Sequence, residues 1–301
     1  MTTGPLTADP PTRSLLSAAR HCLVESRPVV QIVFLMRFLV GAVCGAVGGE
    51  DWSAGGVLLG GLAMTCAVMA AYLLNGVMDI AEDRANGSRR PIARGALRLR
   101  TAAAGVRVLS GAALVLSVFV PGEFWFIVLS LFLGYAYSVP PLAAKRRTAT
   151  SAAAVIAMGA SSYLAGAVSA GGGGFSKGPL LFCGLLALWM GFVGAVTKDL
   201  GDIAGDREAG RRTIAVVYGE RTARLFAAVS AVALGTAGLL LGLRTEPLML
   251  AGAVPLALGA GWVAVRCLWP DKEQARGPYR AFMVTQYAAN AGLALGLLVG
   301  K

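Results

Sequence analysis

The sequence has few charged residues and almost no histidine. Charged residues make up 14% of the 301 positions, and His21 is the only histidine. This scarcity argues against a Ser-His-Asp triad and against a histidine-ligated metal. The five cysteines contain no C-x-x-C pair, so they indicate neither a zinc site nor a disulfide framework. No phosphate-binding P-loop motif and no strand-associated G-x-G-x-x-G motif is present, which disfavours a soluble nucleotide-binding fold.

Hydrophobic residues are abundant instead. They form 56% of the chain, and the mean hydropathy is +0.67, values that soluble domains rarely reach. A helix needs about 20 apolar residues to cross the hydrocarbon layer of a bilayer. The sequence therefore predicts an all-α membrane protein with nine transmembrane helices in a single bundle, over residues 29–48, 54–77, 102–120, 122–141, 151–170, 178–198, 222–243, 247–268 and 280–300.

The basic residues predict the orientation of this bundle. By sequence, 22 lysines and arginines fall before the first span or in alternate loops on one side, against three on the other side. The positive-inside rule then places the N-terminus in the cytoplasm and the C-terminus on the outer side, with the plasma (inner) membrane as the expected location. The net charge of +11 is interpreted as topology and contact with anionic lipid, so no nucleic-acid partner is expected.

The polar segment 1–28 is expected to be a short cytoplasmic lead that is disordered or lies on the membrane surface. It contains three prolines and lacks the apolar core and cleavage site of a signal peptide. Residues 29–301 are expected to form one helical domain. The glycine run at 171–174 is interpreted as an outer loop.

Two acidic clusters stand at the ends of spans two and six. The first reads NGVMDIAEDR and contains Asn75, Asp79 and Asp83; the second reads KDLGDIAGDR and contains Asp199, Asp202 and Asp206. Spacings of three or four residues put each set on one helix face.

Several carboxylates gathered at a bilayer edge need a cation to offset their mutual repulsion and lost hydration. Magnesium suits this arrangement, because it prefers oxygen ligands and is usually shared between one or two carboxylates and a substrate phosphate. An acid at a helix end beside arginines is more often a solvated ion pair. That alternative covers Glu82, Glu208 and Glu220, but it accounts poorly for two such triplets at equivalent ends of two spans.

These motifs, together with GYAYSVPPLAAKRR at 134–147, resemble those of the UbiA superfamily of intramembrane prenyltransferases. SRRPIARG at 88–95 and DREAGRRTIAVVYG at 206–219 are similar to the family's continuations of the two motifs. The resemblance covers nearly the whole chain. It implies nine helices around a central, lipid-accessible cavity, with the two aspartate motifs facing each other at its cytoplasmic mouth.

The resemblance also implies roles for individual residues. An isoprenyl diphosphate would bind through Mg²⁺ held by Asn75, Asp79, Asp83, Asp199, Asp202 and Asp206. Asp79, Asp83, Asp199, Asp202 and Lys145 are the expected catalytic residues. The expected substrate-binding residues are Arg84, Arg90, Tyr137, Lys145, Arg146, Lys198 and Arg37. Arg37 is included because of its depth in the first span, from which it is expected to face the cavity and meet an acidic acceptor.

The chain departs from the family's aromatic-acid members in its first helix, where ESRPVVQ at 25–31 lacks their Asp-Lys pair. The Lys198-Asp199 start of the second motif is similar to members that prenylate homogentisate or build archaeal ether lipids. We expect Mg²⁺-dependent transfer of an isoprenyl group from its diphosphate to a small, hydrophobic or aromatic acceptor, in contact with membrane lipid. The alternatives are a membrane terpene cyclase of the same superfamily, which quenches the cation without an acceptor, and a cation or proton transporter. The transporter is disfavoured because the acids lie at span ends.

Overall fold

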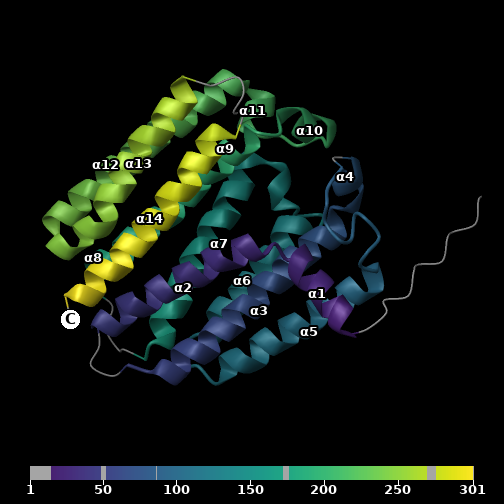
Figure 1. The fold of residues 1–301 in the computed structure, drawn as a ribbon, viewed down its shortest axis with the longest axis horizontal. Helices are drawn as coiled ribbons and strands as arrows, with labels where there is room; N and C mark the ends of the chain where they lie inside the picture. The colour runs from purple at the N-terminus through teal and green to yellow at the C-terminus, as the bar shows by residue number, and fades with distance from the viewer. Residues whose placement is uncertain (1–14, 49–51, 86, 172–175, 270–275, 301) are drawn as a thin grey trace, which may run out of the picture.

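The computed structural model describes residues 15–48, 52–85, 87–171, 176–269 and 276–300. Residues 1–14 of the expected lead, 172–174 of the glycine run and the C-terminal Lys301 lie outside the described residues. The described part is helical (Figure 1), with the elements α1 Leu15–Glu25, α2 Pro28–Gly48, α3 Ala54–Met78, α4 Ile80–Ala85, α5 Leu99–Val118, α6 Phe124–Ser138, η1 Ala144–Arg146, α7 Thr148–Ser169, α8 Lys177–Trp189, η2 Met190–Gly194, α9 Ala195–Asp199, α10 Ile203–Glu208, α11 Ile214–Val217, α12 Glu220–Arg244, η3 Pro247–Met249, α13 Leu250–Leu268 and α14 Gly277–Val299.

Eight segments of the described chain are long and apolar enough to cross a membrane, which makes this a multi-pass membrane protein. The segment expected at 122–141 differs, because its helix α6 has only 15 residues and ends at Ser138. Pro140 and Pro141 follow directly, and proline removes a backbone donor and disfavours helical geometry in the residue before it. Nine full-length spans were expected. The described residues contain eight such segments and one shorter apolar helix instead.

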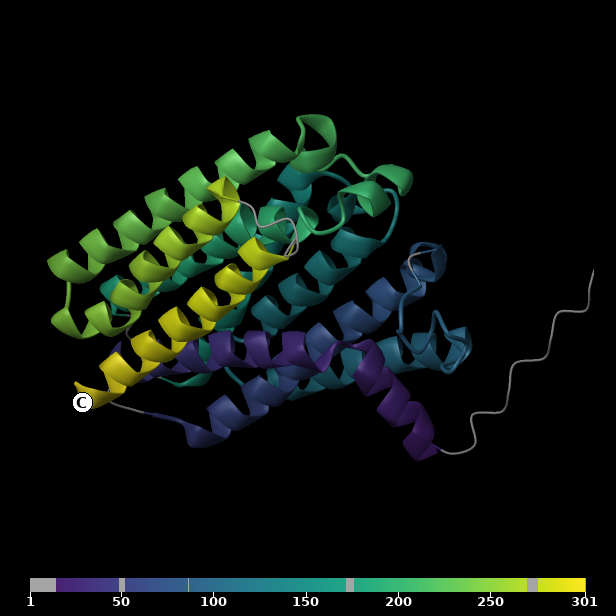
Figure 2. The same ribbon diagram turned by 45° about the horizontal axis from the view of Figure 1, so that its top comes forward.

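The long helices run side by side along one common direction (Figures 1 and 2). On one side, α13 packs between α12 and α14; on the other, α3 packs against α5 and α6. Helices α2 and α7 lie between these groups, and each contributes side chains to the hydrophobic clusters on both sides. The two clusters thus meet at α2 and α7.

Glycines allow α2 and α7 to approach closely. A Cβ atom on Gly41 would lie 1.9 Å from the carbonyl oxygen of Tyr163, and one on Gly166 would lie 1.8 Å from the carbonyl oxygen of Phe38. Any side chain at either position would therefore push the two backbones apart. Lipid offers no hydrophobic force between helices, so close backbone packing of this kind is what holds them together.

The polar lead contains a helix that the sequence reasoning did not predict. Helix α1 ends at Glu25, and the chain turns at Arg27, whose φ of 55° is in the left-handed region. Figure 2 shows α1 leaving the bundle at an angle to α2. Its exposed Leu15, Leu16 and Leu23 suit a helix lying at a membrane surface.

Both acidic motifs lie at the same end of the bundle. Helices α4, α10 and α11 gather there, opposite the C-terminal end of α14 (Figure 1). The loops that follow α6 and α10 are joined by a parallel β-bridge between Arg147 and Arg212, and the Arg212 amide donates to the Arg146 carbonyl at 2.8 Å. This joint fixes the position of Lys145 relative to the second motif.

Candidate active site

A cavity of about 280 Å³ opens between the two acidic motifs. Five of the six predicted metal ligands line it: Asn75, Asp79, Asp83, Asp199 and Asp202. Of the predicted substrate-binding residues, Tyr137, Lys145 and Lys198 line it as well. Residues that are more than 100 positions apart in the sequence therefore share one space.

The first motif is not a continuous helix. Helix α3 ends at Met78, and Asp79 takes φ −98° and ψ 12°, before α4 begins at Ile80. The single helix face expected from the spacing is thus broken, yet the motif still borders the cavity. Ser138 Oγ donates to Asn75 Oδ1 at 3.1 Å, and Lys145 Nζ pairs with Asp79 Oδ1.

The second motif is also interrupted. Helix α9 ends at Asp199, Asp202 precedes the first turn of α10, and Asp206 lies within α10. Asp206 does not line the cavity and is buried, and its Oδ2 has no hydrogen-bond partner among the residues that the structure describes. Burial raises the pKa of Asp206 above its ordinary value, although Arg211 and Lys198 nearby oppose this shift.

Arg211 joins the two motifs, and the sequence reasoning did not assign it to the site. Its Nη2 lies 2.5 Å from Glu82 Oε2, and its Nη1 lies 3.3 Å from Asp206 Oδ1. Both Arg211 and Glu82 line the cavity, so Glu82 is more than a solvated acid. Burial works to lower the pKa of Arg211, but the hydrogen bond and charge of Glu82, together with Asp206, outweigh it and raise that pKa. The sequence feature that could have identified Arg211 as a site residue is its position in DREAGRRT, the continuation of the second motif.

Four of the predicted substrate-binding residues lie outside the cavity lining. The Nε atom of Arg84 donates to the carbonyl of Ala93 at 3.2 Å, and Arg146 is exposed. Arg90 is buried in ion pairs with Glu25 and Asp83. Arg27, which the sequence reasoning used only for topology and for the family comparison, does line the cavity.

Arg37 is the fourth of these residues and lies deep in α2. It is fully buried, and its guanidinium carbon lies 5.1 Å from the ring centroid of Phe34. Phe34 lines the cavity and Arg37 does not, so the charge sits one helical turn beyond the lining. None of the guanidinium nitrogens has a hydrogen-bond partner within the described chain. A charged group at membrane depth is usually functional.

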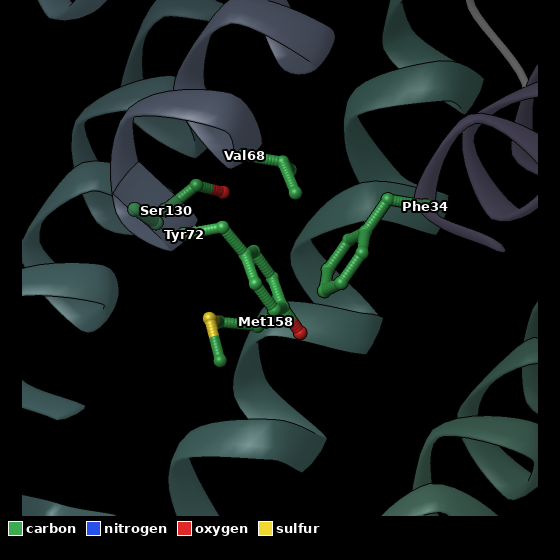
Figure 3. A pocket seen from close by; sticks show the side chains of 6 residues that line it. Phe34, Val68, Tyr72, Ser130 and Met158 are labelled. Atoms are coloured by element: carbon green, nitrogen blue, oxygen red, sulfur yellow. The ribbon is translucent and has the colours of Figure 1, made fainter. Parts of the chain in front are cut away.

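The inner part of the cavity is apolar and aromatic. Figure 3 shows a separate small recess beside the cavity; Phe34, Tyr72 and Met158 line both, while Val68 and Ser130 line the recess alone. The rings of Phe34 and Tyr72 meet edge to face at 6.4 Å. On the other wall the ring of Phe282 stacks between Tyr279 at 5.8 Å and Trp189 at 5.9 Å. Such surfaces suit an isoprenoid chain and, through their π-faces, a transient carbocation.

Span six carries a π-helical turn, η2 Met190–Gly194, beside the cavity. Met190 and Gly194 both belong to the lining. A π-turn inserts one extra residue and re-aims the side chains that follow, and such turns are frequent at functional sites. Hydropathy carries no signal for it, so the sequence reasoning missed it.

The donor set fits Mg²⁺ supplied together with a phosphate. In the described chain, no three His, Cys, Asp or Glu side chains stand close enough to hold a metal by themselves. Mg²⁺ usually takes only one or two carboxylates and completes its octahedron with water and substrate phosphate. Asp199 and Asp202 have no ion-pair partner in the described part of the chain, and Asp206 keeps one free oxygen. The cavity therefore offers carboxylate oxygens that form no ion pair among the described residues.

Comparison with known proteins agrees with this geometry. The model of the UbiA prenyltransferase family matches residues 34–285. The chain is 32% identical over 220 residues to digeranylgeranylglyceryl phosphate synthase of Halobacterium salinarum, covering 73% of this chain and 74% of that protein. It is 32% identical over 168 residues to probable homogentisate phytyltransferase 2, chloroplastic, of Oryza sativa subsp. japonica, covering 53% of this chain and 44% of that one.

A solved structure shares the fold over nearly its full length. The UbiA homolog from Archaeoglobus fulgidus, determined with GPP and Mg²⁺ bound, aligns with a TM-score of 0.68 at 18% identity. The alignment covers 93% of this chain and 99% of that one. At this identity the likeness concerns the fold.

Proposed function

The chain belongs to the UbiA prenyltransferase family, and from that premise we propose that it transfers an isoprenyl group from its diphosphate to a small, aromatic acceptor. The observation that carries the proposal is that both acidic motifs and four cations, Arg27, Lys145, Lys198 and Arg211, line one cavity whose inner walls are apolar. The multi-pass fold suits a donor that reaches this cavity from the lipid.

We place the diphosphate at the polar mouth. Lys145, Lys198 and Arg211 are positioned to contact phosphate oxygens, and the Tyr137 hydroxyl to donate a hydrogen bond. Asn75, Asp79, Asp83, Asp199, Asp202 and, behind them, Asp206 would hold Mg²⁺. When bound, Mg²⁺ neutralises negative charge that develops on the departing diphosphate.

The aromatic walls would hold the isoprenyl chain. As the allylic carbon–oxygen bond breaks, its electron pair stays with the diphosphate, and the cation forms beside Phe34, Tyr72 and Phe282. These rings exclude water and offer π-density to the cation. A nucleophilic ring carbon of the acceptor then forms the new carbon–carbon bond, and the proton on that carbon is released.

A glyceryl phosphate acceptor is the second candidate. The observation favouring it is the match to the Halobacterium synthase, which extends over about three-quarters of both chains. Arg37 does not discriminate between the two candidates, because it is fully buried and does not line the cavity.

The test uses purified protein in lipid nanodiscs with Mg²⁺. Geranyl, farnesyl and geranylgeranyl diphosphates are each combined with phenolic acids or with a prenylglyceryl phosphate. A prenylated phenol supports the proposal, whereas a doubly prenylated glyceryl phosphate selects the second candidate. A free terpene hydrocarbon identifies a cyclase, and absence of any product contradicts transfer.

For location, we propose the plasma membrane, with the N-terminus in the cytoplasm and the C-terminus outside. Cysteine labelling of loop variants on intact cells tests this orientation.

A further inference from the structure

Glu25, the last residue of α1, is buried although glutamate is rarely buried without a partner. Its Oε2 accepts the Ile92 amide hydrogen at 2.9 Å, and its Oε1 lies 2.6 Å from Arg90 Nε. The loop after α4 is therefore tied to the surface helix through one carboxylate.

Arg90 extends this tie to the first acidic motif. Its Nη1 donates to Asp83 Oδ2 at 2.8 Å, and its Nη2 donates to the carbonyls of Glu25 and Tyr72, each at 3.3 Å. Asp83 lines the cavity, while Glu25 and Arg90 do not. The guanidinium thus holds Asp83 from behind, on the side away from the substrate.

Helix α3 is shaped to admit this pair. A Cβ atom on Gly76 would lie 2.2 Å from Glu25 Oε1 and 2.6 Å from Arg90 Nη2. Any larger residue at position 76 would displace the ion pair. Glycine at position 76 of the first motif is therefore explained by the space that the Glu25–Arg90 ion pair occupies.

The charges explain what Glu25 contributes. Arg90 faces two carboxylates, so Glu25 satisfies much of its positive charge and Asp83 keeps negative charge to offer toward the cavity. Without the charge of Glu25, Arg90 would pair with Asp83 alone and compete with a metal ion for it.

We propose that Glu25 is a positioning residue that acts through Arg90 to set the orientation and charge of Asp83. This inference rests on the proposed function, because it assigns Asp83 to the binding of a divalent cation. Partners behind metal ligands commonly change metal affinity by about 10–100-fold when they are mutated.

The experiment compares wild-type protein with Glu25→Gln, which keeps the shape and can still accept the Ile92 hydrogen but loses the charge. Mn²⁺, as a spectroscopic probe for Mg²⁺, is titrated by electron paramagnetic resonance with an unreactive diphosphate analogue present. We expect the Mn²⁺ dissociation constant to rise by about tenfold. The matched control is Glu220→Gln, whose carboxylate pairs with Arg224 on α12, away from the cavity. It should bind Mn²⁺ as the wild type does.

Equal Mn²⁺ affinity in wild type and a folded Glu25→Gln protein would overturn the proposal. Should that variant fail to fold, Glu25→Asp is titrated instead, because it keeps the charge and shortens the reach. It is expected to bind Mn²⁺ more weakly than the wild type, and an unchanged affinity overturns the proposal equally. If the wild type forms no prenylated product, the proposed function fails while the Mn²⁺ titration still decides the role of Glu25.

Discussion

The two acidic motifs face the same cavity but differ in how their charges are compensated. In the first, Asp79 pairs with Lys145, Glu82 with Arg211, and Asp83 with Arg90. In the second, Asp206 pairs with Arg211 through Oδ1, whereas Asp199 and Asp202 have no ion-pair partner among the residues that the structure describes. The Oδ2 atom of Asp206 is buried and has no hydrogen-bond partner among the same residues.

Under the proposed function, this difference predicts an order in which the two motifs take up cations. A cation that approaches the first motif competes with lysine and arginine already paired with its carboxylates, whereas one that approaches the second motif meets Asp199 and Asp202, which form no ion pair among the described residues. We therefore expect the second motif to gain more from the first cation to arrive, because that cation displaces no ion pair at Asp199 or Asp202 within the described residues.

The largest expected effect comes from removing one carboxylate from each motif. Asp79→Ala and Asp202→Ala should each lower turnover by about 10³-fold or more, because electrostatic stabilisation of the leaving group is lost. In the absence of diphosphate, only Asp202→Ala should weaken Mn²⁺ binding. Product assays and an Mn²⁺ titration measure these two effects. Equal weakening by both variants would break the comparison, and retained turnover in either would contradict the metal assignment.

A smaller effect, of mixed sign, is expected from Lys145→Met. Turnover should fall by about 10²-fold because a phosphate contact is lost. Mn²⁺ binding without diphosphate should instead strengthen, since Asp79 loses its internal competitor. Arg147→Met, an exposed change two positions along, serves as the control. Weaker Mn²⁺ binding in Lys145→Met would show that Lys145 does not compete with the metal.

Arg211→Gln should raise the KM for the donor diphosphate by about tenfold, since one charged hydrogen bond is lost. The bridge between the motifs is measured by a double-mutant cycle with Glu82→Gln, where contacting groups typically show a coupling of about 0.5–3 kcal/mol. Additive effects on KM would mean that Arg211 and Glu82 act separately. The control is Arg221→Gln, a substitution in the same basic region.

The smallest effect concerns stability without metal. Asp206→Asn removes a buried charge whose Oδ2 has no partner, so it should stabilise the protein in EDTA by about 1 kcal/mol. The same substitution should reduce the stabilisation that Mg²⁺ and a diphosphate analogue provide together. Thermal unfolding in detergent measures both quantities. A lower unfolding temperature of the variant in EDTA would show that the buried charge of Asp206 does not destabilise the metal-free protein.

Much of the fold was predictable because hydropathy reports burial in lipid directly. The spans expected at 54–77 and 178–198 correspond to Ala54–Met78 and Lys177–Asp199. Helix α1, the shortened α6 and the π-turn were not predicted, since each depends on tertiary packing or on a local break. The family was predicted from the motifs and is confirmed, and the kinship suggested by Lys198-Asp199 agrees with the names of the matched relatives.

The site was predictable only where spacing carries the signal. Regular intervals identified the carboxylates, and five of the six proposed ligands line the cavity. Arginine partners were harder, because Arg90 and Glu25 are 65 positions apart and meet only after α1 folds back beside α3. A basic loop in the sequence shows that cations lie near the acidic motifs, but not which of them line the cavity. For this reason the predicted set of substrate-binding residues included Arg84, which does not line the cavity, and lacked Arg211, which does.

The contact between Lys145 and Asp79 also bears on how a catalytic cycle ends. Under the proposed function, the ammonium group of Lys145 would turn toward a bound diphosphate and would pair with Asp79 again once that leaving group departs. The protein thus carries its own counter-ion for Asp79, which would balance this carboxylate between turnovers.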